Sequence, residues 1–340
     1  MSCRNPIIIG GSGSSGSSLL ATILNRHPEI AIGSELSLFN KPVLYENDWD
    51  EFSKNLKKYI LKGSSTNGWF LYWKSMKTIE EYGWEIESLI EMSLDCKNKV
   101  EFIDNFFNKF LKKNNKTIWA EKTPSNAYYF KSFLKLYPKG RIIHIYRDYK
   151  DVVASFQKRD MTAYYSSMLY LYNTASALSC RGFKNYYELS YEDLVSNPSG
   201  SLKDICNFLS LSYDESMLHS KNENVSRKLR SWNNDPSSKI SISSIGKGKT
   251  DLSDYNYYVF DHIRISKSHV MKYKLNYDNI EDVVKLFNYN YQKKSYPMHL
   301  RFYYMIKLLL SMITDNLKRF VIMIYIDKKI HTLPGKIKFW

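Results

Sequence analysis

The chain has 340 residues, of which 44 % are hydrophobic and 15 % are aromatic. A chain this rich in apolar and aromatic residues can bury a sizeable core, which excludes an intrinsically disordered protein. Its 49 Lys and Arg outnumber 34 Asp and Glu, so the formal net charge is +15. Such an excess attracts nucleic acid, anionic lipid or phosphorylated and sulfated ligands, although a solvated lysine-rich surface would have the same composition.

Cysteine usage and the N-terminus bear on the compartment. Cys3, Cys96, Cys180 and Cys206 form no CxxC pair, and no histidine lies near them at a zinc-binding spacing. They are expected to be buried free thiols of a reducing compartment. The apolar run at 7–9 is too short for a signal peptide, so a cytoplasmic protein is expected, with a peripheral membrane contact as a variant of this hypothesis.

Strand-like and helix-like segments alternate over the first 210 residues. Strands are expected at 6–9, 30–32, 117–120, 141–146 and 186–190. Helices are expected at 17–25, 125–137, 148–157, 164–180, 191–194 and 202–209, with a polar helical stretch at 48–113. Strands separated by helices predict a mainly parallel sheet covered on both faces, which is an α/β, P-loop-type three-layer fold.

The last third of the chain is less regular. Residues 231–254 are rich in Ser, Asn, Gly and Lys, and we expect a loop or lid there. Residues 300–326 are apolar, but their longest uncharged runs are seven residues, well short of a membrane span. We favour a pair of helices packed on the core over a basic amphipathic element on an anionic membrane. A main domain at 1–295 and a helical C-terminal extension at 296–340 are therefore expected.

A serine- and glycine-rich turn at 11–18 separates the first expected strand from the first helix. Glycines let the backbone approach a ligand closely, and the N-terminus of the next helix offers N–H groups to an anion. The spacing matches the nucleotide phosphate loop G-x4-G-K-[ST], except that Ser17 replaces the lysine. Because that lysine reaches the β- and γ-phosphates in NTPases, its replacement favours another phosphate-bearing ligand. A flexible linker is the alternative.

A second candidate anion site follows the strand at 141–146. This strand delivers Arg147 to its carboxyl end, and Ser155 lies eight residues later in the next helix. Ligands of open α/β sheets bind at the carboxyl ends of the strands, so the guanidinium and hydroxyl groups are expected to hold a second phosphate. An Arg147–Asp148 pair that caps the helix is an equally good interpretation.

Taken in order, these motifs resemble the sulfotransferase family that uses phosphoadenosine phosphosulfate (PAPS), especially the branch with tyrosylprotein sulfotransferases and bacterial relatives. The first motifs are Gly11 to Ser18 with Leu19, His27-Pro28-Glu29 with Gly33-Ser34-Glu35, and Glu121-Lys122-Thr123-Pro124. The later ones are Arg147-Asp148 to Ser155, Ser190 to Val195 with Asn197-Pro198, Phe208-Leu209, and Ser244-Ile245-Gly246-Lys247. The resemblance covers residues 5–255.

The resemblance implies where PAPS binds. The sulfate-bearing phosphate would be held by Gly13, Ser14, Ser15, Gly16, Ser17 and Ser18. The ribose phosphate would be held by Arg147 and Ser155, with Lys247 as a late contact and Tyr191 lining the nucleotide. A core tyrosine at a strand end is the alternative for Tyr191. Relatives commonly carry Arg or Lys at the position of Ser14 or Ser17, so this loop leaves open which cation meets the leaving phosphate.

The resemblance also implies catalytic roles. Sulfuryl transfer from PAPS to an acceptor hydroxyl would use Glu35 as the base, with His27 as the alternative. A helix-ending turn before Pro28 is the preferred explanation of His27. Lys122, helped by Ser17, would stabilise the bridging oxygen as charge builds on the leaving phosphate. No metal is expected, because a single cation can meet this charge.

The acceptor and two competing functions stay open. Segments 40–115, 160–185 and 231–255 are expected to shape the acceptor pocket, and their Tyr and Trp suit sugar rings. A carbohydrate acceptor is therefore the first hypothesis, followed by a lipid-linked or tyrosyl hydroxyl. Nucleic acid is not an expected partner, whereas an anionic membrane could contact residues 300–326. One competing function is a small-molecule kinase or NTPase with a degenerate phosphate loop, in which Asp148 would bind Mg. The other is a non-catalytic protein that binds polyanions or membrane.

Overall fold

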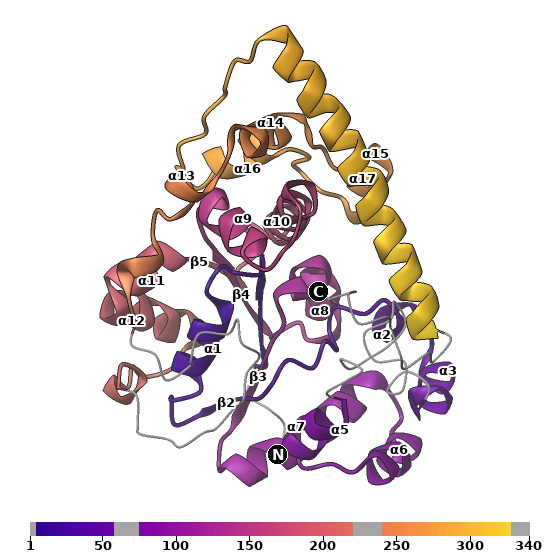
Figure 1. Cartoon of the computed structure of the whole chain (residues 1–340). Helices are drawn as coiled ribbons and strands as arrows, with labels where there is room; N and C mark the ends of the chain where they lie inside the picture. The colour runs from indigo at the N-terminus through magenta and orange to yellow at the C-terminus, as the bar shows by residue number, and fades with distance from the viewer. Residues whose placement is uncertain (1–4, 58–74, 220–239, 328–340) are drawn as a thin grey trace. The chain divides into compact units, whose positions relative to one another are not determined.

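The fold is seen in a computed structural model that describes residues 5–57, 75–219 and 240–327. Its sheet has five parallel strands in the order β2-β3-β1-β4-β5. The strands are β1 (Ile7–Gly11), β2 (Ile30–Ile32), β3 (Ile118–Lys122), β4 (Arg141–Tyr146) and β5 (Tyr186–Ser190). Each lies where the sequence predicts a strand, so the predicted α/β class with a mainly parallel sheet is confirmed (Figure 1).

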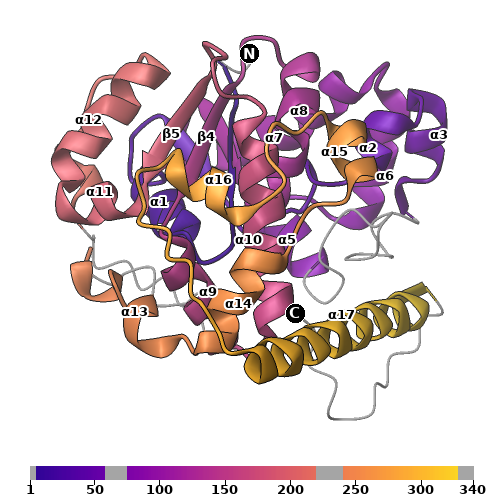
Figure 2. The ribbon, with the colours of Figure 1, turned by 90° about the horizontal axis from the view of Figure 1, so that it is seen from above.

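Both faces of the sheet are buried under helices, as parallel sheets require. On one face, Ile7 and Ile9 of β1 join a hydrophobic cluster with Leu20 of α1 (Ser17–Leu24) and Leu202 of α12 (Pro198–Leu209). On the other face, a 3₁₀ turn η2 (Pro124–Tyr129) and α10 (Ala163–Leu178) lie against β1. Figure 2 shows these layers from above.

The chain forms two compact units, each described here by itself. One comprises 2–33 and 114–295 and holds the whole sheet; the other comprises 34–113 and 296–340. The remaining helices of the sheet unit are α8 (Phe130–Leu136), α9 (Tyr149–Gln157), α11 (Tyr191–Ser196), η3 (Glu215–Met217), η4 (Ile242–Ser244), α13 (Gly248–Asp251), α14 (Asp254–His262), α15 (Lys267–Tyr273) and α16 (Ile280–Lys285).

The other unit is helical and has an aromatic core. Its helices are α2 (Val43–Glu46), α3 (Trp49–Lys54), α5 (Ser75–Glu81), α6 (Ile86–Asp95), α7 (Lys99–Asn114) and α17 (Met298–Asp327). Tyr82 packs on Phe106 and Phe110 of α7, with ring centroids 5.2 and 4.4 Å away. Trp84 donates from Nε1 to the carbonyl of Phe106 at 3.0 Å, so its polar atom is satisfied. None of the described helices is both long and apolar enough to cross a bilayer.

Three sequence expectations need correction or restriction. The helix expected at 125–137 is split into η2 and α8. The expected loop at 231–254 lies partly outside the described residues, and its remainder forms the short turns η4 and α13 and the first residue of α14. The C-terminal extension is helical as expected, but it is one helix rather than a packed pair, because no Gly or Pro interrupts 298–327.

The expected free thiols are confirmed for Cys96, Cys180 and Cys206, which are buried and unbonded to one another. Cys3 lies outside the described residues. Burial raises the pKa of Cys180 to about 11, so this thiol stays protonated at neutral pH. Such thiols act as small core side chains rather than as nucleophiles.

A buried polar contact fixes the end of β1, where the serine- and glycine-rich turn begins. Glu121 of β3 has no exposed surface, and its carboxylate accepts from Thr123 Oγ1 at 2.6 Å and from Asn126 Nδ2 at 2.5 Å. Asn126 Nδ2 also donates to the carbonyl of Ile9 at 3.2 Å. The amide of Asn126 therefore links η2, β1 and β3.

We expect Asn126→Ala to lower the free energy of unfolding by about 2–3 kcal/mol, because it leaves a buried carboxylate and a buried carbonyl short of a donor. Urea denaturation measures the loss. The control is Asn207→Ala on the exposed side of α12, which should cost about 0.5 kcal/mol or less. Equal losses in the two variants would contradict the linking role of Asn126.

Candidate active site

The turn between β1 and α1 has the features of an anion site. Gly16 is the N-cap of α1 at φ +89°, and it has no side chain to bond the first-turn N–H groups, which are left for a ligand. Ser12 and Ser15 are buried, and their hydroxyl oxygens have no hydrogen-bond partner among the described residues. Because buried polar groups are normally paired, these donors fit a bound phosphate or sulfate.

Tyr191 at the start of α11 closes one side of this turn. A Cβ on Gly16 would lie 2.4 Å from a ring carbon of Tyr191, so only glycine fits at this position. The guanidinium carbon of Arg147 lies 4.4 Å from the centroid of the same ring. The Tyr191 ring therefore packs against both predicted anion-binding segments.

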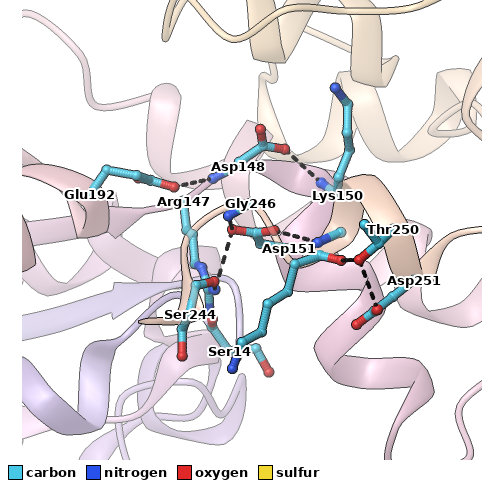
Figure 3. A network of polar contacts seen from close by, with 12 residues as sticks. Ser14, Arg147, Asp148, Lys150, Asp151, Glu192, Ser244, Gly246, Thr250 and Asp251 are labelled. Carbon is cyan, nitrogen blue, oxygen red and sulfur yellow. Dashed lines mark hydrogen bonds and ion pairs between the residues drawn. The ribbon is translucent and has the colours of Figure 1, made fainter. Parts of the chain in front are cut away.

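Arg147 joins the end of β4 to the serine- and glycine-rich turn. Its side chain is buried, and Nη1 donates to the carbonyl oxygen of Ser14 at 3.1 Å. Nη2 lies 3.3 Å from Asp151 Oδ2 and also donates to the carbonyl of Ser244. The two segments that the sequence treats as separate anion sites are thus in direct contact, as Figure 3 shows.

Arg159, just past the end of α9, is a cation that the sequence analysis missed. Its Nη2 donates to Ser14 Oγ, and its Nε donates to the carbonyl of Ser155 at 3.3 Å. Burial lowers the pKa of Arg159, although an arginine keeps its charge at any physiological pH. Its position one helical turn after Ser155 is a sequence signal that could have identified it.

Lys122 supplies a further cation from the end of β3. In the sheet, Lys122 is the partner of Ile9 on β1, so it emerges beside the turn that follows β1. It is 7 % exposed, and its Nζ donates to Ser18 Oγ at 3.1 Å. Lys122, Arg147 and Arg159 therefore all contact a turn that contains no cation of its own.

Asp151 holds the later segment 244–248 against α9. Its carboxylate accepts from the backbone N–H of Gly246 at 2.8 Å and of Gly248 at 2.7 Å, and it also faces Arg147. Gly248 lies so close that an added Cβ would be 2.3 Å from the carbonyl carbon of Lys150. Lys247 lies exposed between these two anchored glycines.

Asp148 serves as the N-cap of α9. Its carboxylate accepts from the N–H of Lys150 at 2.8 Å, and its own N–H donates to Glu192 at 3.0 Å. Tyr289 donates to the second oxygen of Glu192 at 2.7 Å. Burial raises the pKa of Asp148, the N–H of Lys150 opposing this shift. Asp148 therefore caps the helix as the alternative interpretation expected, but the ion pair of Arg147 is with Asp151 rather than with Asp148.

The two candidate bases differ in what the structure says of them. His27 is buried: Nδ1 accepts from the N–H of Glu29 at 3.1 Å, and Nε2 therefore donates to the carbonyl of Ser212 at 3.0 Å. One ring nitrogen thus bonds the turn that ends α1, and the other bonds the segment after α12. Glu35, half-buried three residues after β2, belongs to the helical unit, and its role as the base stays a prediction.

The remaining predicted site residues are placed as follows. Gly13 lies against Phe156 of α9, whose ring would be 2.9 Å from an added Cβ. Ser17 is buried at the first position of α1, and Ser155 is half-buried on α9. Except for Glu35, all the predicted site residues belong to the sheet unit.

One family model and several known proteins are similar to this chain. Residues 6–215 match the family model described as the sulfotransferase family. A putative protein-tyrosine sulfotransferase from Caenorhabditis briggsae is 22 % identical, over 63 % of this chain and 68 % of that protein. The sulfotransferase domain of the Synechococcus olefin synthase is 20 % identical, covering 84 % of this chain and 96 % of that domain at a TM-score of 0.49. A mouse sulfotransferase complexed with PAP is 14 % identical, covering 84 % and 89 % at a TM-score of 0.42.

We expect Gly16→Ala to destabilise the protein more than a matched change at Gly182. Both glycines have positive φ, at +89° and +91°, so alanine costs about 1–2 kcal/mol of backbone strain at either position. Only Gly16 adds a contact with the Tyr191 ring, whereas a Cβ on Gly182 meets open space. Urea denaturation should show the larger loss for Gly16→Ala, and Tyr191→Ala in the same chain should remove the excess. Identical losses at the two glycines would refute the close packing.

Asp151→Asn should release the segment 244–248. In asparagine an NH2 group replaces one carboxylate oxygen. This group only donates hydrogen bonds, so one glycine N–H loses its acceptor. Backbone N–H groups of Gly246 and Gly248 should exchange with solvent about tenfold to a hundredfold faster. The control is Asp251→Asn, which affects an exposed ion pair with Lys158 and should leave these rates nearly unchanged. Unchanged exchange in Asp151→Asn would show that the segment is held otherwise.

Proposed function

Because this chain belongs to the sulfotransferase family, we propose that it transfers a sulfuryl group from PAPS to an acceptor hydroxyl, using the turn 11–18 and Arg147 to hold the donor. The observation that carries the proposal is the convergence of Lys122, Arg147 and Arg159 on Ser14 and Ser18. Three cations at a turn with two unpaired buried hydroxyls suit a ligand with several negative charges.

The two phosphates of the donor are assigned to adjoining groups. The N–H groups and hydroxyls of residues 13–18 would bind the sulfate-bearing phosphate. Arg147 and Ser155 would bind the ribose phosphate, and Lys247 would add a contact from the segment anchored by Asp151. Arg159 contacts both Ser14 and the carbonyl of Ser155, so we add it to the donor site. Tyr191 would line the nucleotide.

The chemistry requires charge stabilisation and removal of one proton. The acceptor oxygen forms a bond to sulfur while the bond from sulfur to the bridging phosphate oxygen breaks. Lys122, whose Nζ bonds Ser18, would meet the negative charge on the departing phosphate oxygen. Ser17, the sequence neighbour of Ser18, would help it. Glu35 would take the acceptor proton. The products are a sulfated acceptor, phosphoadenosine phosphate (PAP) and a protonated Glu35.

The acceptor class rests on composition and on one relative. A carbohydrate is the first hypothesis, with a lipid-linked or tyrosyl hydroxyl next; the name of the C. briggsae relative supports the tyrosyl hydroxyl. The acceptor segments 40–115, 160–185 and 231–255 are described except at 58–74 and 231–239. The proposed partners are PAPS, this acceptor and an anionic membrane in contact with residues 300–326. Nucleic acid is not a proposed partner.

A kinase or NTPase is the less favoured function. It requires a carboxylate that is available to Mg²⁺ at a strand end, whereas Asp148 is occupied as the cap of α9. The two functions differ in their ligands. PAP should raise the melting temperature in Mg-free buffer, and ATP with Mg²⁺ should not. Stabilisation by ATP with Mg²⁺ alone would favour the kinase.

The proposed activity is tested directly with sulfur-labelled PAPS and a panel of glycans, phenols and tyrosyl peptides. Transfer of label to one class identifies the acceptor. Stabilisation by neither PAP nor ATP, together with vesicle or polyanion binding that depends only on salt, would instead favour the non-catalytic binder.

We expect Lys122→Ala to lower turnover by about two to four orders of magnitude, as loss of a group that stabilises developing charge does. Affinity for PAPS should fall less, because Arg147 and Arg159 remain. The control is Lys203→Ala on the exposed side of α12, which should keep normal turnover. Normal turnover in Lys122→Ala would show that another group meets the leaving oxygen.

A further inference from the structure

Over residues 298–318, helix α17 exposes most of its apolar side chains. In this stretch the side chains that are at least partly covered recur every three or four positions, at Leu300, Tyr304, Leu308, Ser311, Met312 and Asp315. This spacing places them in one row along the helix. Several large apolar residues on the helix are instead 50–60 % exposed: Phe302 60 %, Leu309 50 %, Leu310 56 %, Ile313 57 % and Leu317 57 %.

The exposed apolar residues form one stripe. Phe302, Ile306, Leu309, Ile313 and Leu317 are spaced by three or four positions, so they share one face of the helix. At 100° per residue, this face lies opposite the covered row. Single exposed apolar side chains are ordinary, but a continuous stripe of this length marks an interaction surface.

The charges on α17 indicate what covers this stripe. Within 298–318 the exposed ionisable groups include the basic residues Arg301 and Lys318, and Arg319 follows in the sequence. The acidic residue in that stretch, Asp315, is buried and accepts from Ser311 Oγ at 3.3 Å. The exposed surface of the described stretch therefore combines apolar and cationic side chains and lacks carboxylates. An anionic surface with an apolar interior is complementary to it.

We propose that α17 is a membrane-docking helix that lies in the plane of an anionic lipid surface, with the stripe from Phe302 to Leu317 among the acyl chains. Arg301 precedes the stripe and Lys318 follows it in the sequence, each turned by about 100° from its neighbour in the stripe, and their long side chains extend toward the headgroup phosphates while their stems stay apolar. The net charge of +15 adds long-range attraction to the same surface. This docking holds whether or not the chain transfers sulfate, because it uses no residue of the donor site.

A second copy of the chain is the other occupant that such a stripe could have. An apolar dimer interface needs no anionic partner, and cations on both copies would oppose each other there. The dimer therefore predicts association in solution without lipid, whereas membrane docking predicts a monomer that binds vesicles. The two outcomes are separable with the full chain.

The test is flotation of the full chain with vesicles of phosphatidylcholine alone and of equal parts phosphatidylcholine and phosphatidylglycerol. We expect binding to the anionic vesicles and a loss of binding at high salt. Leu309→Glu should weaken that binding by about thirtyfold or more, because one inserted side chain is lost and a repelled charge is gained. Arg301→Gln with Lys318→Gln should weaken it by about tenfold or more.

Leu94→Glu is the matched control. Leu94 is 63 % exposed on α6, in the same unit, so the change removes the same side chain and adds the same charge away from α17. It should weaken vesicle binding by less than about fivefold. The melting temperatures of both Glu variants should equal that of the parent chain. Equal binding by Leu94→Glu and Leu309→Glu, no flotation with anionic vesicles, or a lipid-free dimer that Leu309→Glu dissociates would each overturn the proposal.

Discussion

The candidate site depends on the hydrogen bonds and the ion pair of the buried Arg147 guanidinium. It bonds the carbonyl of Ser14 in the first turn and the carbonyl of Ser244 in the later segment, and it pairs with Asp151 on α9. A buried charge with a single partner would be costly, whereas this one has several acceptors. Three segments far apart in the sequence thereby share one cation, and their relative positions are fixed by it.

The parallel sheet explains why these segments meet at all. Because β1 lies between β3 and β4, the residues that follow all three strands emerge at the same edge. Lys122 and Arg147 thus reach the turn after β1 from opposite sides. A phosphate loop that lacks its own lysine can therefore be supplied with charge by its neighbours, and Arg159 supplies more from beyond α9.

Sequence patterns predict the strands well because each is a short apolar run bounded by turn residues, as at Ile30–Ile32. They also indicate that Lys122 and Arg147 meet the turn after β1, because these residues stand at the ends of strands. For Arg159 they offer one signal, its position four residues after Ser155, but its contact with Ser14 depends on side-chain reach at the end of a helix. They do not reveal that α17 is one helix with an exposed stripe, because hydrophobic spacing alone does not say which face is covered.

Two neighbouring carboxylates, Asp148 and Asp151, have different roles that only the tertiary structure distinguishes. Asp148 and Asp151 are three positions apart on α9, yet one caps the helix and the other anchors Gly246 and Gly248. The sequence pattern suggests Asp148 as the partner of Arg147. Tertiary contacts resolve the choice, because only Asp151 lies within ion-pair distance of the Arg147 guanidinium.

The central claim is that the turn 11–18 and Arg147 grip two phosphates of one nucleotide. Isothermal titration calorimetry of the full chain tests this claim. The ligands are PAP and two adenosine monophosphates, one that carries only the ribose phosphate and one that carries only the phosphate to which the sulfate is attached in PAPS. PAP should bind at least about a hundredfold more tightly than either monophosphate, since each phosphate contributes charge-assisted hydrogen bonds. Equal affinities for PAP and for one monophosphate would contradict the claim.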